Sequence, residues 1–221
     1  LPICPRSRSG LPQSARATDP SVDTNDQRPL RHIDARGAFD SGRDDMTPAD
    51  LKALVRTIPD FPKKGIQFRD ITTLLGNGRG FAASVEWLAD EVRGAEAIAG
   101  MEARGFIFGA AVSARLGLPF LPIRKSGKLP CQVIGVDYEL EYGLDRLEMD
   151  PQSVSDGQQV AIVDDLLATG GTALAATALL RKAGARVSRA AFVIGLPDLG
   201  GSKRLADEAV DVRALMEFAG D

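Results

Sequence analysis

Residues 160–172 read VAIVDDLLATGGT, and this stretch decides which fold the chain is expected to adopt. Its first residues are apolar and predict a buried strand over 159–163, and a helix is predicted over 171–182, closed by Gly184. A strand that is apolar on both faces and leads into a helix is typical of a parallel sheet with helices on both faces. Ligands bind beyond the carboxyl ends of such strands, so the two acids and the turn after them mark the candidate site.

The same alternation runs through the rest of the chain. Strands are predicted at 97–100, 119–123, 187–196 and 210–218, and helices at 81–92, 106–116 and around Leu205. Before them, Thr47 and Pro48 begin a predicted helix that continues through Ile58 and ends at Pro59, with a loop after it. The sequence therefore predicts an α/β fold: a parallel sheet with helices on both faces, plus a small N-terminal hood.

Residues 1–45 differ in composition from residues 46–221. They contain arginine but no lysine, many Ser, Pro and Asp residues, and no periodic apolar pattern. Such a segment cannot bury enough surface to offset its chain entropy, so we expect a disordered extension before one folded domain over 46–221. A transit peptide is the alternative, because the first eighteen residues are rich in Arg and Ser and lack acids. We favour an extension, with Met46 as the natural start.

Composition narrows the class of protein. The net charge is −3 and the pI is near 5.3, which argues against nucleic acid as the main partner. The apolar runs are too short to span a membrane. The two cysteines, Cys4 and Cys131, have no metal-ligand spacing, so a reducing cytoplasmic location is expected. The single histidine, His32, lies in a polar stretch and gives a histidine-based mechanism little support.

The turn over 168–172 has the properties of a phosphate site. Backbone N–H groups at a helix start are unpaired and lie at the positive end of the helix dipole. Thr169 and Thr172 add hydroxyl donors, and Gly170 and Gly171 allow oxygens to approach the backbone closely. The acids before the turn can accept hydrogen bonds from two ribose hydroxyls beside such a phosphate. The alternative, acids that only end a strand before an ordinary turn, explains the ordered pattern less well.

Cations follow two other predicted strands. Arg104 lies in a tight Ala-Arg-Gly turn, and Arg124, Lys125 and Lys128 surround a glycine further along. Together they could neutralise a pyrophosphate leaving group. An exposed turn arginine explains Arg104 equally well on local sequence, and a basic cluster is more often a solvated face. The position of the cluster at a strand's carboxyl end favours the functional interpretation.

The segment 133–142 alternates partly and predicts a two-stranded flap, over about 125–145, rather than a strand of the sheet. A flap that carries Glu141 and Tyr142 could close over a site and exclude water. On sequence alone, Glu141 is better explained as a surface charge.

Residues 163–172 resemble the phosphoribosyl pyrophosphate signature of the type I phosphoribosyltransferase family. The resemblance continues through 61–71, 103–106, 123–130 and 140–143, and it covers essentially all of 46–221. Five motifs in the family's order are highly specific. The family transfers ribose 5-phosphate from phosphoribosyl pyrophosphate to a base, and its members imply a homodimer.

The resemblance assigns roles by position. It implies the 5-phosphate on Ala168, Thr169, Gly170, Gly171 and Thr172, the ribose hydroxyls on Asp164 and Asp165, and the pyrophosphate on Arg104, Arg124, Lys125 and Lys128. It implies a base held between Phe68 and Leu166 and read by backbone groups near Arg69, with Glu141 and Tyr142 acting in the closed flap and Glu141 handling the proton. Magnesium is expected, held mainly by substrate and water rather than by protein ligands.

The choice of base depends on an absent lysine. Relatives that use hypoxanthine or guanine carry a lysine near the strand at 192–197, and this chain has none there. Adenine is therefore the expected base, with AMP and pyrophosphate as products in purine salvage. Gln67 stands where an apolar residue is expected, which puts base selectivity in question if it faces the base. The alternatives are transfer to another base, or a sensor of phosphoribosyl pyrophosphate without catalysis.

Overall fold

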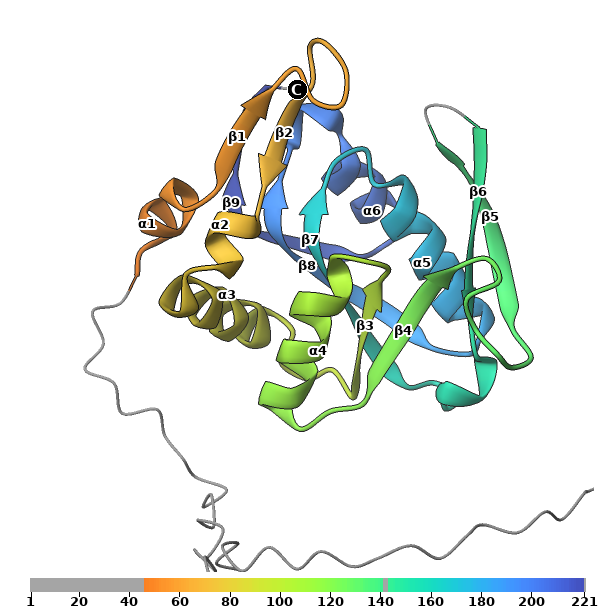
Figure 1. Cartoon of the computed structure of the whole chain (residues 1–221). Coiled ribbons are helices and arrows are strands. Elements are labelled where there is room, and N and C mark those ends of the chain that lie inside the picture. The colour runs from red at the N-terminus through yellow and green to blue at the C-terminus, as the bar shows by residue number, and fades with distance from the viewer. Residues whose placement is uncertain (1–45, 141–142, 221) are drawn as a thin grey trace, which may run out of the picture. The chain divides into compact units, whose positions relative to one another are not determined.

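Five parallel strands and one antiparallel hairpin form a seven-stranded sheet in the order β5-β6-β4-β3-β7-β8-β9 (Figure 1). The computed structural model of the protein describes residues 46–140 and 143–220. The parallel strands are β3 (Ala97–Met101), β4 (Phe120–Lys125), β7 (Gln159–Leu167), β8 (Arg186–Gly195) and β9 (Asp211–Glu217). This arrangement places β3 and β7, which carry the two main motifs, side by side at the centre of the sheet.

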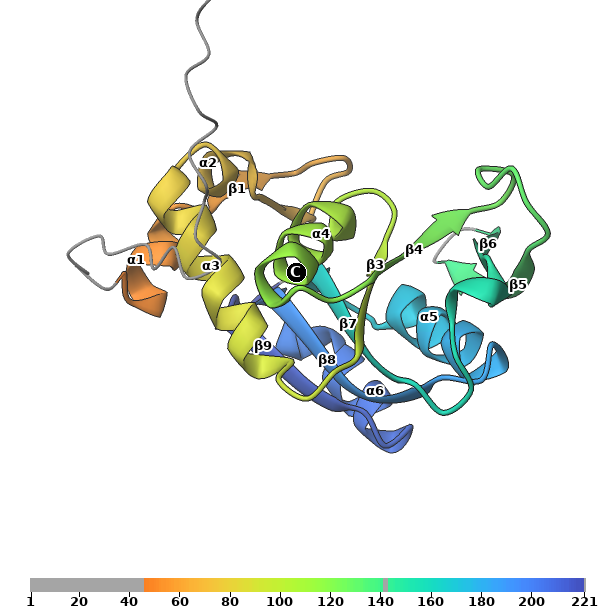
Figure 2. The same cartoon turned by 90° about the horizontal axis from the view of Figure 1, so that it is seen from below.

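Helices cover both faces of the sheet. In Figure 2, α3 (Gly78–Glu91) and α4 (Gly105–Leu116) lie on one side of the strands, and α5 (Gly171–Lys182) and α6 (Gly201–Asp207) lie on the other. Side chains alternate along β7: Val160 and Ile162 pack in the core that includes α5 and α6, and Ala161 and Val163 pack in the core of α3 and α4. The predicted α/β class with a mostly parallel sheet is confirmed.

A small unit precedes the sheet and forms the hood. It contains α1 (Pro48–Ala53), β1 (Arg56–Pro59), β2 (Gln67–Asp70) and α2 (Thr72–Leu75), with β1 and β2 paired antiparallel. Thr47 caps α1 as predicted, through a capping box with Asp50. The prediction that this helix continues through Ile58 is wrong. The helix ends after six residues, because the residues that follow pair with β2 as a strand.

The segment predicted as a flap is a hairpin of β5 (Ile134–Leu140) and β6 (Gly143–Met149). The expectation that it lies apart from the sheet is wrong, because β6 pairs with β4 at Arg124↔Glu148 and Lys125↔Leu147. Its base also contacts α5, where Lys182 Nζ donates a hydrogen bond of 3.2 Å to the Gly135 carbonyl. Two 3-10 turns, Pro151–Ser153 and Pro197–Leu199, complete the described elements.

Some expectations concern residues outside the described ranges. The N-terminal segment 1–45 and the flap residues Glu141 and Tyr142 are among them. Within the residues described, no helix combines the length and apolar character needed to cross a membrane.

Candidate active site

The turn after β7 leaves the start of α5 open. β7 was predicted to end at Val163, but it continues through both acids to Leu167, because it keeps its pairing with β8 as far as Gly195. The turn is therefore shorter than predicted. Gly170 is the N-cap of α5 and has φ +80°, a left-handed conformation that favours glycine, and no side chain caps the helix. The first backbone N–H groups of α5 thus remain available for a ligand.

A cavity of about 290 Å³ lies beside this turn. It brings together the predicted 5-phosphate residues, Asp164, Asp165, Leu166 and Arg104, along with residues 101–103, Leu167, Ala173 and Phe192. A larger hollow of about 590 Å³ lies between α1 and β9, where Lys52 and Glu217 are its charged lining residues. It contains none of the predicted site residues and no long helix start, so we assign the active site to the smaller cavity.

The two acids are crowded into the protein. Asp165 is buried, and its Oδ2 lies 2.9 Å from Nε of Arg104. Asp164 is half-buried and lines the cavity, and its Oδ1 accepts a 2.9 Å hydrogen bond from the Asp165 N–H. Burial raises the pKa of Asp164 well above its usual value, and the adjacent Asp165 carboxylate raises it further. Burial also raises the pKa of Asp165, which Arg104 partly offsets. A pair in this environment favours donors such as ribose hydroxyls.

Close packing fixes the Asp164 side chain against the start of α4. A Cβ added at Gly105 would lie 2.5 Å from Oδ1 of Asp164, so only glycine leaves room for the carboxylate. The Ala-Arg-Gly turn of the sequence therefore has a second purpose besides presenting Arg104. It makes space for an acid of the neighbouring strand.

Arg104 connects the acids to the hood. Its guanidinium carbon lies 5.7 Å from the centre of the Phe68 ring, while its Nε pairs with Asp165. The Phe68 ring in turn meets the Phe61 ring edge-on, with centroids 5.2 Å apart. Leu166 lines the cavity, and Phe68 lies beside Arg104, whose guanidinium covers its ring in this structure.

The other three predicted cations lie at or beyond the border of the cavity. Arg124 donates from Nη2 to Glu102 at 2.9 Å and from Nη1 to the Lys128 carbonyl at 3.0 Å. Lys125 Nζ lies 3.1 Å from Oδ2 of Asp145 on β6, and the Lys128 side chain is exposed. Of these residues only the partner Glu102 lines the cavity. Arg104 is therefore the predicted pyrophosphate cation that the structure places directly against the acids.

Carboxylates that pair with this basic cluster were not predicted from the sequence. Glu102 and Asp145 bind Arg124 and Lys125, and the hydrogen bond from Arg124 lowers the pKa of Glu102. Glu148 accepts hydrogen bonds from the Gly127 N–H at 2.9 Å and the Ser126 hydroxyl at 3.1 Å. The sequence did contain a sign of these pairs: the hairpin segment is rich in acids and follows the cations of 124–128.

The Arg69 side chain faces away from the candidate base site. It donates to the Thr57 hydroxyl at 2.6 Å and to the Ala219 carbonyl at 3.2 Å, and it stacks on Phe218. Successive strand residues point to opposite faces, so Gln67 leaves β2 on the same side as Arg69 and opposite Phe68. The side chain of Gln67 is therefore directed away from Phe68.

Comparison with known proteins identifies the family of this chain. The model of the phosphoribosyl transferase domain matches residues 72–218. The adenine phosphoribosyltransferase of Erythrobacter litoralis is 66% identical over 177 residues, which cover 79% of this chain and 99% of the relative. That of Novosphingobium aromaticivorans is 63% identical over the same shares.

Solved structures of related enzymes share the fold. The crystal structure of adenine phosphoribosyltransferase from Thermoanaerobacter pseudethanolicus has a TM-score of 0.74 and 46% identity, and the match covers 78% of this chain and 100% of that one. The Giardia lamblia enzyme, complexed with 9-deazaadenine, has a TM-score of 0.74 and 31% identity, with 78% and 98% covered. The Saccharomyces cerevisiae enzyme was solved with adenine and an imino-altritol bisphosphate, at a TM-score of 0.70, 35% identity, and 76% and 98% covered. The chain belongs to the phosphoribosyl transferase family and, within it, to the adenine phosphoribosyltransferases.

Proposed function

We propose that this enzyme transfers the phosphoribosyl group of phosphoribosyl pyrophosphate to adenine and releases AMP and pyrophosphate, a step of purine salvage. One observation carries the proposal: a single cavity wall combines the uncapped start of α5, two adjacent acids and an arginine. Phe68, beside that arginine, offers an aromatic face to a purine. The relatives named adenine phosphoribosyltransferases support adenine as the base.

Each part of the substrate has a proposed place. The 5-phosphate binds the turn from Ala168 to Thr172, the ribose hydroxyls bind Asp164 and Asp165, and adenine lies between Phe68 and Leu166. In this structure Arg104 holds both Asp165 and the face of Phe68. Substrate binding therefore requires Arg104 to release both groups, and the negative pyrophosphate is the partner that can replace them.

In the proposed reaction, N9 of adenine forms a bond to the anomeric carbon as the bond from that carbon to pyrophosphate breaks. Positive charge develops on the ribose ring, as in glycoside chemistry, and negative charge leaves with pyrophosphate. Arg104 neutralises the leaving group, and Arg124, Lys125 and Lys128 are proposed to assist it from the border of the cavity. The proton lost from the base passes to Glu141, while Tyr142 helps the flap exclude water.

Magnesium is proposed to arrive with the diphosphate. Among the residues described, no three His, Cys, Asp or Glu side chains gather into a metal site. Phosphate oxygens and water are ligands that Mg²⁺ prefers, and Asp164 and Asp165 are the acids of the cavity that could accept hydrogen bonds from its waters. When bound, the ion would supply positive charge to the leaving group.

A turnover assay with labelled adenine, hypoxanthine, guanine and orotate tests the function. AMP formation with adenine alone supports the proposal. Turnover with another base alone would assign a different transferase. Tight binding of phosphoribosyl pyrophosphate without turnover of any base would identify a sensor.

The role of Glu141 is tested by Glu141→Ala and Glu141→Gln. Both are expected to lower kcat by about 100-fold, the range for loss of one acid–base group, with little change in Kd for either substrate. Gln keeps the size of the side chain and one acceptor oxygen but cannot take a proton. Full activity of Glu141→Gln would therefore remove Glu141 from proton transfer.

We also propose a homodimer located in the cytoplasm. The dimer is supported by the family resemblance. The low cysteine content supports a reducing compartment. Sedimentation equilibrium that gives a monomer mass throughout the micromolar range would contradict the dimer.

A further inference from the structure

The proposed 5-phosphate turn is in direct backbone contact with a second element, the start of α6. Gly201 is buried there against residues 168–170. A Cβ at Gly170 would lie 3.0 Å from Cα of Gly201, and a Cβ at Gly201 would lie 2.9 Å from the Gly170 nitrogen and collide with the Ala168 carbonyl oxygen. Two opposed glycines thus allow the turn to rest on α6.

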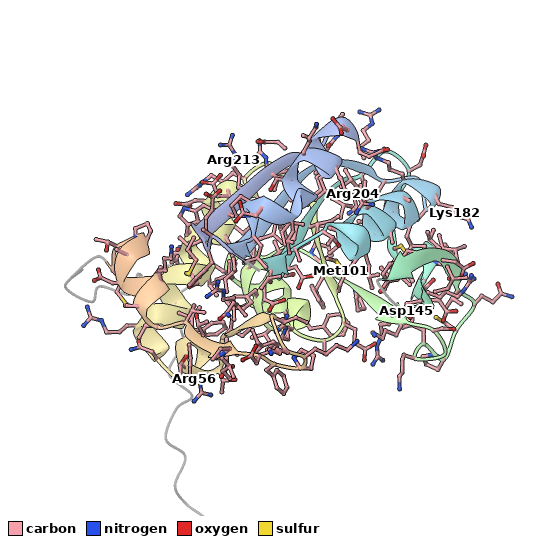
Figure 3. All side chains as sticks on the ribbon, turned by 90° about the horizontal axis from the view of Figure 1, so that it is seen from above. Arg56, Met101, Asp145, Lys182, Arg204 and Arg213 are labelled. Atoms are coloured by element: carbon pink, nitrogen blue, oxygen red, sulfur yellow. The ribbon has the colours of Figure 1, made fainter. Side chains whose placement is uncertain are left out.

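One helical turn later, Arg204 holds the middle of the same turn. Its Nη1 donates a 2.7 Å hydrogen bond to the Thr169 carbonyl. Figure 3 shows Arg204 beside the start of α5. In a trans peptide the carbonyl and the following N–H point in opposite directions. Because Arg204 holds the Thr169 carbonyl, the N–H of Gly170 points away from Arg204. Gly170 lines the cavity, so this N–H is available to a ligand.

Arg204 also brings positive charge to a turn that has none of its own. Residues 168–172 contain no lysine or arginine. A phosphate monoester carries between one and two negative charges near neutral pH, and both the helix start and a nearby guanidinium favour its binding. Arg204 thus both fixes the Thr169–Gly170 peptide by a hydrogen bond and places a positive charge beside it.

We propose that Arg204 is a positioning residue for the 5-phosphate, which holds the turn against Gly201 in the shape that receives the phosphate. This inference rests on the 5-phosphate assignment made in the proposed function. It concerns a residue that does not line the cavity and that no feature of the phosphate motif indicates. Its loss should weaken binding of ligands that carry the 5-phosphate and leave adenine binding and kcat at saturating phosphoribosyl pyrophosphate unchanged.

The test compares Arg204→Gln with Lys203→Gln in the full chain. Lys203 is exposed on the same helix, and its side chain makes no hydrogen bond or ion pair with the described residues. Lys203→Gln therefore removes the same charge without removing a contact. Calorimetry should show that Arg204→Gln raises Kd for ribose 5-phosphate and for phosphoribosyl pyrophosphate about tenfold, the loss of one hydrogen bond from a charged donor. Lys203→Gln should change them less than twofold. Arg204→Lys, which keeps the charge, should fall between the two.

The outcomes separate this inference from the function beneath it. Wild-type protein that binds neither phosphate ligand would overturn the 5-phosphate assignment itself. Wild-type protein that binds both, with Arg204→Gln unchanged, would overturn only the role of Arg204. Equal weakening by Arg204→Gln and Lys203→Gln would show general electrostatic attraction and would also overturn it. So would an equal loss of adenine affinity, which indicates a purely structural role.

Discussion

Asp164 and Asp165 place two carboxyl groups side by side in a poorly solvated part of the protein, which lowers the stability of the folded state when both are ionised. Burial raises the pKa of each, so the folded protein holds a proton on them more tightly than the unfolded chain does. The stability linked to these protons is present below the usual pKa of 3.8 and is lost as the pH rises through the raised values. At neutral pH the acids therefore destabilise the fold, which is a cost expected of groups retained for ligand binding.

The first prediction concerns Asp164→Asn. The neutral amide keeps the shape of the side chain and removes the buried charge. We expect Tm at pH 7 to rise by roughly 2–4 °C, which corresponds to about 1 kcal/mol in a domain of this size, and the gain to shrink as the pH falls toward 4. Calorimetry at several pH values measures this. A variant that is less stable than wild type at pH 7 would contradict the buried-charge argument. Affinity for phosphoribosyl pyrophosphate should fall despite the gain in stability.

The second prediction concerns Gly105→Ala. The added methyl group would approach Oδ1 of Asp164 to 2.5 Å and force the carboxylate to move. We expect Kd for phosphoribosyl pyrophosphate to rise about tenfold, the effect of losing one well-placed hydrogen-bond acceptor. Gly78→Ala is the control, because a Cβ at that first position of α3 meets nothing within 4 Å. Equal affinities in the two variants would show that the position of Asp164 does not matter.

Residues of the candidate site could be predicted to lie together where their pattern is local. The acids, the glycines and the threonines of 164–172 lie together in the sequence, and so does the basic cluster of 124–128. The partners that fix them come from far along the chain: Asp165 pairs with Arg104, and Thr169 with Arg204. No local pattern indicates such pairs, because they depend on which strands become neighbours.

Within the hood, the Asp70 side chain accepts hydrogen bonds from both α2 and β1. Its Oδ1 accepts from the Thr72 N–H at 2.9 Å at the start of α2, and its Oδ2 accepts from Arg56 of β1 at 2.5 Å. Hydrogen bonds from Thr72, and then the contact with Arg56, lower the pKa of Asp70 to about 2. The unfolded chain therefore binds this proton more tightly than the folded protein.

The third prediction follows for Asp70→Asn. The stabilisation by the ionised acid is complete above about pH 4 and is lost as the pH falls toward 2. We expect the variant to be less stable than wild type by about 1–2 kcal/mol at pH 6, a modest value because Arg56 is largely exposed. Urea unfolding at pH 6 and pH 2.5 measures the difference, which should be smaller at the lower pH. A constant difference would exclude titration of Asp70 as its cause.

Element boundaries were predicted least well where an edge partner decides them. The apolar spacing from Leu51 to Ile58 fits a helix, but pairing with β2 makes residues 56–59 a strand. β7 runs on through the acids because β8 remains beside it, a contact that a polar sequence does not indicate. The helix over 171–182, which starts and ends on local glycine signals, matches its prediction residue for residue.

For the whole molecule, we predict that residues 46–221 fold and bind without residues 1–45. In the described part of the chain, both apolar cores are formed by residues from 46 onward. The phosphoribosyl transferase model matches residues 72–218. The shortened protein should have a Tm within about 2 °C of the full chain, which is less than 1 kcal/mol, and an unchanged Kd for phosphoribosyl pyrophosphate. Scanning calorimetry and binding measurements on both forms provide the comparison. A loss of Tm of about 10 °C would show that the first segment contributes to the folded domain.

The sheet order has a consequence for how the protein is made. The cavity is lined by residues of β3 and β7, and the turn beside it contacts α6, so these parts leave the ribosome over a long interval. At about 5–20 residues per second, roughly 5 to 20 s separate the synthesis of Arg104 from that of Arg204. Until then the turn of a growing chain lacks its contact with α6, so we expect substrate to protect that chain from proteases less than it protects the finished protein. If translation is arrested before α6, the rate at which proteases degrade the nascent polypeptide should therefore depend less on added phosphoribosyl pyrophosphate than that of the finished protein does.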